Sequence, residues 1–289
     1  MSVDVVVDDR ALTGESPLWS VAEGALYWVD TWRERIERIH LASGKRDAWT
    51  VPAKIAAVGL RASGGLVVAM RTGIAFLDTT TGELEHIVDP EPGKPENRLN
   101  DGKVDRAGRF WFGSMEESAT QPVGKLYRFA PGNTVAALDD GIVLPNGPAW
   151  SPDDRRMYLA DSRRECIYVY DFDAAAGTVH NRRLFASVPK ATGIPDGATV
   201  DVEGHLWSAR PGGWSIVRYT PDGALERVVE MPVARPTSVM FGGDDLRTLF
   251  ITTASSRIEP AALAAQPHAG AILAIRTDVP GLPEPLFAG

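Results

Sequence analysis

A strand-like pattern recurs along the chain at intervals of about 45 residues, and this repeat constrains the fold more than any other feature. Each copy contains a short alternating segment rich in aromatic and β-branched residues, preceded by a turn signal of glycine or acidic residues. We expect strands at residues 25–30, 65–69, 109–113, 156–160, 205–209 and 248–252. All-strand units of this length are typical of the blades of a β-propeller.

The chain length agrees with a ring of six such units. Six repeats of about 45 residues account for roughly 270 of the 289 residues, and frequent tight turns explain the 28 glycines and 21 prolines. We therefore predict an all-β fold, a six-bladed β-propeller formed by one domain over residues 1–289, with a central metal-binding channel. Residues 3–7 are expected to add a strand that closes the last blade, and residues 259–265 to form a short helical excursion.

Other architectures explain the pattern less well. Two β-sandwich domains would also supply short strands, but they would not repeat one hairpin signature through the whole chain. Helical repeats are disfavoured because the apolar residues do not recur with a period of 3.6.

Charge and composition exclude several classes of partner. The net charge of −8 disfavours nucleic acid and anionic membranes, and no apolar stretch reaches 18 residues. Cys166 is the single cysteine, so neither a disulfide framework nor a cysteine-rich zinc site can form. The N-terminal residues do not resemble a signal peptide. We expect a cytoplasmic protein, a monomer or weak homo-oligomer, that binds neither nucleic acid nor membrane.

One position in each repeat is expected to face the channel, because the innermost strand of a propeller blade lines it. The residues at this position form a predicted ring of Glu15, Ala57, Asn100, Asn146, Asp196 and Ser238. Two carboxylates and two carboxamides in a narrow channel would repel or remain unpaired, and a divalent cation removes both costs. Asn-Gly and Asp-Gly pairs can also be simple turn formers. Because these residues occupy the same position in each repeat, a ring of side chains facing the channel is favoured over simple turns.

Motifs of several other enzyme classes are missing from the sequence. There is no Gly-x-Ser-x-Gly nucleophile elbow, no His-Glu-x-x-His zinc motif, no phosphate loop and no dinucleotide-binding fingerprint. The all-oxygen ring suits hard cations such as calcium, magnesium or manganese.

Several segments, taken together and in order, resemble the regucalcin (senescence marker protein) and gluconolactonase family of sugar lactonases. They are residues 14–19 (GESPLW), 98–105 (RLNDGKVD), 146–151 (NGPAWS), 194–197 (IPDG), 241–243 (FGG) and 269–272 (AGAI). The resemblance covers essentially the whole chain. It implies a six-bladed propeller that holds one divalent metal in its channel, and many members hydrolyse aldonolactones.

The resemblance also implies roles for particular residues. The metal ligands would be Glu15, Asn146 and Asp196, while Asn100 would lie beside the metal and contact substrate or a metal-bound water. Arg98 would hydrogen-bond to sugar hydroxyls. Substrate contact is also expected from a glutamate after the segment 113–115, which is Glu117 here, although Ser118 occupies the position of the family's second glutamate.

The resulting hypothesis is metal-dependent hydrolysis of a sugar lactone, such as a glucono-, xylono-, arabino- or galactonolactone, to its aldonic acid. The metal (Ca, Zn, Mn, Mg or Fe) would polarise the carbonyl, and Asp196 would activate water as the catalytic base. Alternatives are a related hydrolase acting on another ester or phosphoester, and a calcium-binding regulatory protein without catalysis. An interaction scaffold of the WD-repeat kind would not explain the carboxylates of the ring.

Overall fold

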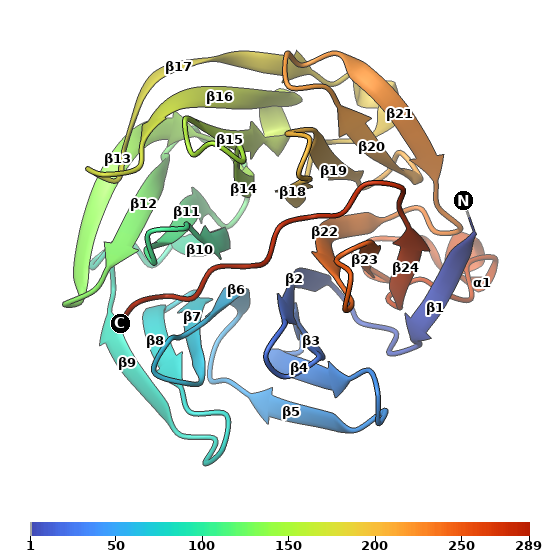
Figure 1. Cartoon of the computed structure of the whole chain (residues 1–289), viewed down its shortest axis with the longest axis horizontal. Coiled ribbons are helices and arrows are strands. Elements are labelled where there is room, and N and C mark those ends of the chain that lie inside the picture. Colours follow the sequence, from blue (N-terminus) through green and yellow to red (C-terminus); the bar gives the residue numbers. More distant parts are fainter. Residues whose placement is uncertain (1) are drawn as a thin grey trace.

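The computed structural model describes residues 2–289, and within this part of the chain nearly all regular structure is β-strand. Twenty-four strands form six four-stranded antiparallel sheets. Figure 1 shows these sheets arranged as blades around a central axis. The predicted six-bladed β-propeller is therefore confirmed.

Each blade has its innermost strand at the channel, and the following strands lie progressively farther out. Blade 1 consists of β2 (Gly14–Ser20), β3 (Ala25–Asp30), β4 (Arg35–His40) and β5 (Arg46–Thr50). Blade 2 consists of β6 (Ile55–Leu60), β7 (Leu66–Met70), β8 (Gly73–Leu77) and β9 (Leu84–Val88). Blade 3 consists of β10 (Asn97–Val104), β11 (Phe110–Glu116), β12 (Gly124–Ala130) and β13 (Thr134–Ile142). Blades 4 and 5 consist of β14 (Pro145–Trp150), β15 (Arg156–Asp161), β16 (Cys166–Asp173) and β17 (Thr178–Ser187); and β18 (Ala198–Val200), β19 (Leu206–Arg210), β20 (Ser215–Tyr219) and β21 (Leu225–Glu230).

The sixth blade joins the two ends of the chain. Its strands, from the channel outward, are β22 (Pro236–Gly242), β23 (Thr248–Thr253), β24 (Ile272–Arg276) and β1 (Val3–Val7). β1 pairs antiparallel with β24, with Val3 opposite Ile275. The predicted closing strand is confirmed, and so is the helical excursion, which forms α1 (Pro260–Ala264) between β23 and β24.

The six segments expected from the repeat are the second strands of the blades: β3, β7, β11, β15, β19 and β23. β3 and β7 are buried along their whole length because neighbouring blades cover both faces of each sheet. Apolar side chains therefore pack between blades, as Tyr27 of blade 1 does in one cluster with Leu66 of blade 2. The outermost strands β5 and β9 are more exposed.

The residues of the predicted ring occupy equivalent places in the six blades. In five blades the pairing of the innermost and second strands shifts at this position, and such bulges re-aim a side chain. These shifts occur at Glu15, Ala57, Asn100, Asn146 and Ser238. In the remaining blade Asp196 lies just before β18, and its backbone N–H donates to Ala209 O at 3.1 Å.

Residues 277–289 cross one end of the channel, and we call this segment the C-terminal strap. Figure 1 shows it running over the centre of the ring, from blade 6 to blades 2 and 3. Its backbone bonds to several blades: Pro280 O accepts from Val202 N at 3.1 Å, and Phe287 N donates to Leu60 O at 2.7 Å. Because the blades are related by rotation, the strap covers the end where the innermost strands finish. The opposite end, where they begin, lies away from it.

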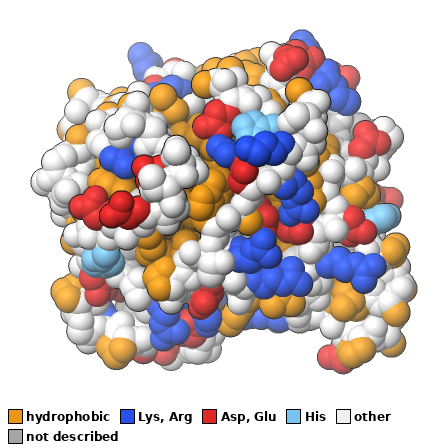
Figure 2. Space-filling model, turned by 90° about the horizontal axis from the view of Figure 1, so that it is seen from below, with side chains coloured by type: hydrophobic (Ala, Val, Ile, Leu, Met, Phe, Trp, Pro, Cys, Tyr) orange, Lys and Arg blue, Asp and Glu red, His pale blue; other side chains and the backbone are white. Residues whose placement is uncertain are grey.

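No helix in residues 2–289 is long and apolar enough to cross a membrane. Seen from the side, the surface mixes acidic, basic and apolar side chains, and several basic ones gather near the middle of the face shown (Figure 2).

Candidate active site at the open end of the channel

The predicted site residues come together where the innermost strands begin. Glu15 lies in β2, Asn146 lies in β14, and Asp196 lies two residues before β18. Backbone contacts join these places: Gly197 N donates to Thr237 O at 2.9 Å, and the Thr237 hydroxyl donates to Gly14 O at 2.5 Å. The chain around Asp196 is thereby linked through blade 6 to the chain around Glu15.

Glycine allows the blade of Asn146 to approach Asp196. Gly147 has a φ of +60°, and a Cβ there would lie 2.7 Å from the backbone oxygen of Asp196. Any larger residue would clash with that oxygen and would also be strained in this left-handed conformation. The Asn-Gly pair is thus more than a turn former, because its glycine lets two channel strands pack closely beside the ring.

Two asparagines share a hydrogen bond in the channel. Asn100 Nδ2 donates to Asn146 Oδ1 at 2.7 Å and to Pro145 O at 2.8 Å, while Asn100 Oδ1 accepts from Arg98 at 2.7 Å. Asn146 Nδ2 in turn donates to the hydroxyl of Ser162 at 2.8 Å. Both carboxamides therefore have fixed orientations, and Arg98 is held next to the predicted ring.

The carboxyl groups of Glu15 and Asp196 influence each other electrostatically. Burial raises the pKa of Glu15 well above its usual value, and the negative charges of Asp196 and Asp101 raise it further. Burial and Asp101 also raise the pKa of Asp196, while the positive charge of Arg235 lowers it. The hydrogen bonds that favour these carboxylates come from the backbone of Ser16 and Gly197. The pair is therefore costly when ionised.

The donor set fits a hard divalent cation. Two carboxylates that repel each other gain most from a charge of +2 between them, and the Asn146 carboxamide adds a neutral oxygen. Such all-oxygen sets are typical of calcium, magnesium and manganese sites.

Asp101 belongs to this site, although the sequence analysis did not include it. Its φ of 30° is unusual for a non-glycine residue, and its carboxylate accepts the backbone N–H groups of Gly102 at 2.7 Å and Gly147 at 2.6 Å. It therefore ties blade 3 to blade 4 beneath the ring. The repeat placed only Asn100 in the channel, whereas the bulge at that position turns the next residue inward too.

Glu117 also lies at the open end, directly after β11, and it contacts three cations. Its carboxylate is 3.0 Å from Lys54 Nζ, 3.1 Å from an Arg71 nitrogen and 3.6 Å from Arg98 Nε. The adjacent Ser118 instead donates to the exposed Glu116 at 2.7 Å. The structure thus brings Glu117, and not Ser118, next to Arg98.

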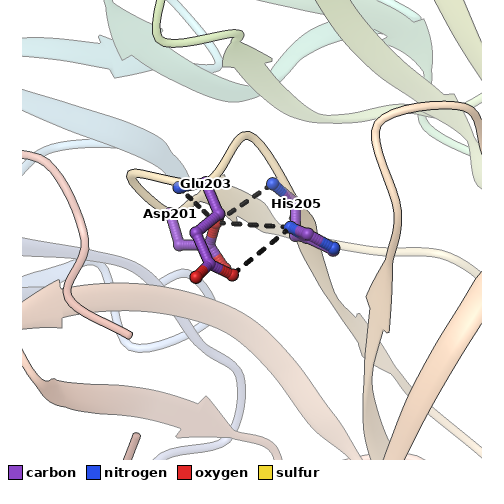
Figure 3. Close-up of side chains that lie close together, drawn as sticks. All are labelled: Asp201, Glu203 and His205. Carbon is purple, nitrogen blue, oxygen red and sulfur yellow. Dashed lines mark hydrogen bonds and ion pairs between the residues drawn. The ribbon is translucent and has the colours of Figure 1, made fainter. Parts of the chain in front are cut away.

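A second group outside the channel could also hold a cation by its spacing. The side-chain ligand atoms of Asp201, Glu203 and His205 lie within 4.8 Å of one another in blade 5 (Figure 3). However, the Arg218 guanidinium already binds two of them, with 2.9 Å from Nε to Asp201 and 2.7 Å from Nη2 to Glu203. Asp201 also accepts the Trp207 indole N–H at 2.9 Å.

Blade 3 contains a similar buried aspartate bound by a tryptophan and an arginine. Among the residues that the structure describes there, no cluster of possible cation ligands surrounds it. There Asp105 accepts the Trp111 indole N–H at 2.7 Å and the Arg109 Nε–H at 2.7 Å. In both blades a buried aspartate holds the turn between the first two strands, and an arginine supplies the counter-charge. We therefore assign Asp201 a structural role.

Comparison with known proteins places this channel site in a family. Residues 13–255 match the family described as the SMP-30/gluconolactonase/LRE-like region. The chain belongs to this family. Membership agrees with the resemblance found in the sequence, and the match covers every residue of the predicted ring.

Among curated SMP-30/gluconolactonase/LRE-like relatives, the chain is similar to a 6-deoxy-6-sulfogluconolactonase from Pseudomonas putida, with 37% identity over 98% of each chain. It is also 36% identical to a pentonolactonase from Haloferax volcanii, over 88% of this chain and 86% of that one. A crystal structure of regucalcin from Agrobacterium tumefaciens, described as a calcium-binding protein, superposes with a TM-score of 0.95. That chain is 29% identical, with 99% of this chain and 97% of the other covered. The relatives of this chain thus include two proteins named as sugar lactonases and one described as a calcium-binding protein.

Proposed function

We propose that the protein hydrolyses a sugar lactone to its aldonic acid with the help of one divalent metal. The observation that carries this proposal is the convergence of Glu15, Asn146 and Asp196, with Asn100 and Arg98 beside them, at the open end of a channel. The names of the lactonase relatives supply the substrate class. The closing of the ring by β1 and β24 supports our further proposal that residues 1–289 form one domain.

Glu15, Asn146 and Asp196 would hold the cation through their side-chain oxygens. A divalent cation bound there supplies Lewis acidity, which polarises a carbonyl and stabilises negative charge on its oxygen by several kcal/mol. Asn100 and Arg98 would orient the sugar. Arg98 donates to Asn100 Oδ1, and Asn100 Nδ2 donates to Pro145 O and Asn146 Oδ1. The guanidinium N–H groups of Arg98 that these bonds leave unused are available to substrate hydroxyls.

Asp196 is the proposed general base. Asp196 combines a place in the predicted ring with a carboxylate that could partly release the metal and take a proton. In the proposed step, a carboxylate oxygen of Asp196 accepts a proton from the water that attacks the lactone carbonyl. The ring C–O bond then breaks, and the former ring oxygen takes the proton back from Asp196 and leaves as the hydroxyl of the aldonic acid.

The test combines metal removal with substitution. We expect protein treated with EDTA to lose hydrolysis of five- and six-carbon lactones, and calcium, manganese, magnesium, zinc or iron to restore it. Asp196→Asn should lower kcat by about 10²-fold or more, the range expected for losing a general base. The exposed Asp171→Asn serves as the matched control. Equal activity of the wild type and Asp196→Asn, with no metal dependence, would refute the proposal.

Calcium binding without catalysis is the second candidate, because the regucalcin relative is described as calcium-binding. Calorimetric titration distinguishes the two. Calcium binding that Glu15→Gln abolishes, with no turnover of any lactone, would favour the second candidate.

A further inference from the structure

Basic side chains gather around the open end of the channel. Lys54 and Arg235 precede the innermost strands β6 and β22, and Arg98 lies near the start of β10. Arg71 follows β7 and Arg257 follows β23, so both reach the same end from second strands. This concentration is not a consequence of composition, since the whole chain carries a net charge of −8.

These cations outnumber the carboxylate that holds them. Glu117 alone pairs with Lys54, Arg71 and Arg98 at 3.0 to 3.6 Å. Burial lowers the pKa of Arg98, the charges of Glu117 and Glu15 raise it, and the positive charges of Arg257 and Arg71 lower it. Like charges held this close repel one another. Glu15 and Asp196 also lie near these cations, but a divalent metal held by the two would offset their charge. With the metal bound, the cations at this end would exceed the negative charge of Glu117.

Arg235 and Trp32 are two further side chains that affect the balance of charge at this end of the channel. In residues 2–289 the buried Arg235 Nε has no hydrogen-bond partner, although an unpaired buried donor is costly. Trp32 presents its ring to Lys54, whose Nζ lies 4.0 Å from the ring centroid, and to Arg257 at 6.0 Å. An aromatic ring between two cations holds them in place without neutralising either charge.

A cavity of about 430 Å³ adjoins Arg98, and three basic and two acidic residues are among those that line it. Arg71, Arg98 and Lys94 line it together with the neutral Thr72 and Asn97, and the acidic Asp89 and Glu91. Glu91 is already satisfied, because it accepts hydrogen bonds from Asn97, Ser114 and Tyr127 and pairs with Lys94 at 3.4 Å. A group bound between Arg71 and Arg98 would meet two guanidinium groups, of which that of Arg98 hydrogen-bonds to Asn100. The Arg71 guanidinium also donates to Glu117 and to Pro95 O.

We propose that the substrate is an anionic sugar lactone, with a sulfonate, phosphate or carboxylate on the carbon farthest from the lactone carbonyl, bound by Arg71 and Arg98. This inference depends on the proposed lactone hydrolysis. A neutral sugar needs hydroxyl partners but gains nothing from a surplus of cations. Guanidinium groups, in contrast, match the paired oxygens of such anions. The same charges also attract the substrate from a distance, which makes its capture sensitive to salt.

The experiment compares kcat/KM for D-glucono-1,5-lactone with its 6-phosphate and 6-deoxy-6-sulfonate derivatives and with glucaro-1,5-lactone, at low and high salt. We expect at least one anionic lactone to be preferred about tenfold or more. We also expect this preference to shrink as salt increases, while hydrolysis of the neutral lactone changes little. The preferred anion identifies which of the three groups the site takes.

Arg71→Gln should remove about tenfold in kcat/KM for the anionic lactone, mainly through KM, and change the neutral lactone less than twofold. Arg276→Gln is the matched control, because Arg276 is exposed and pairs with Asp245 away from the channel. Equal loss for both substrates, or equal kcat/KM for neutral and anionic lactones in the wild type, would overturn this inference and leave the proposed function standing. Failure to hydrolyse any lactone would overturn both.

Discussion

The C-terminal strap offers the sharpest test of how the ring is held together. Phe287 is fully buried, stacks on Phe129 with ring centroids 5.1 Å apart, and lies 5.9 Å from Phe76. Truncating a buried phenylalanine to alanine costs about 3–5 kcal/mol of unfolding free energy. With an unfolding entropy of about 2.1 cal/mol/K per residue, this cost lowers the melting temperature of a chain of this length by roughly 5–8 °C.

The measurement is thermal and urea unfolding of the wild type, Phe287→Ala and the neighbouring control Leu286→Ala. Leu286 is 48% exposed, so its truncation should change stability by no more than about 0.5 kcal/mol. Because the strap and the candidate site lie at opposite ends of the channel, kcat/KM at 25 °C should change less than twofold in both variants.

Two results would refute the reasoning. Equal unfolding midpoints for Phe287→Ala and Leu286→Ala would show that the strap contributes no packing energy. A large loss of lactone hydrolysis in Phe287→Ala, with its stability intact at the assay temperature, would show that the strap and the site are not separate.

Three further predictions concern buried polar groups. Burial raises the pKa of Glu284, so the ionised form of this side chain disfavours folding. Glu284→Gln should therefore stabilise the protein at pH 8. Melting scans across pH should show that this gain in stability vanishes below about pH 4.3, where the glutamate is protonated in both the folded and the unfolded state. Asp201→Asn should cost about 1–3 kcal/mol in urea unfolding because it weakens buried hydrogen bonds, although Arg218 keeps Glu203 and Glu226 as partners. Metal content measured by mass spectrometry should stay unchanged. Burial also raises the pKa of the Cys166 thiol, so a disulfide reagent should modify it in urea but only slowly in the native protein.

The repeat predicted the blades because their strands are specified locally. A turn signal followed by alternating aromatic and β-branched residues marks each second strand, and both faces of that strand are buried whatever the blade. The ring was predictable for the same reason, since rotation about the channel brings residues of equal phase to the same level. The roles of Glu15, Asn146 and Asp196 as ligands remain predictions.

What the sequence analysis missed depends on contacts between segments far apart in the chain. Asp101 enters the site because a bulge turns it toward Gly147 of the next blade. The cations around Glu117 come from different blades and become neighbours only when the ring closes. A signal for them was present, since Lys54, Arg98 and Arg235 all stand two or three residues before a ring position. The sequence of the strap shows no periodic pattern, and its conformation is determined by its contacts with the blades that it crosses.

Side chains and the C-terminal strap fill the channel beneath the candidate site, so the channel is open to solvent at one end. Between Asp101 and the strap, Lys103 donates to Ala198 O at 2.9 Å and approaches Glu284. The two cavities that Lys103 and Glu284 line there measure only about 10 and 30 Å³, room for a few waters at most. A sugar cannot pass through such a space. Substrate entry and product exit must therefore use the same opening, so an accumulating aldonic acid should compete directly with fresh lactone for that opening.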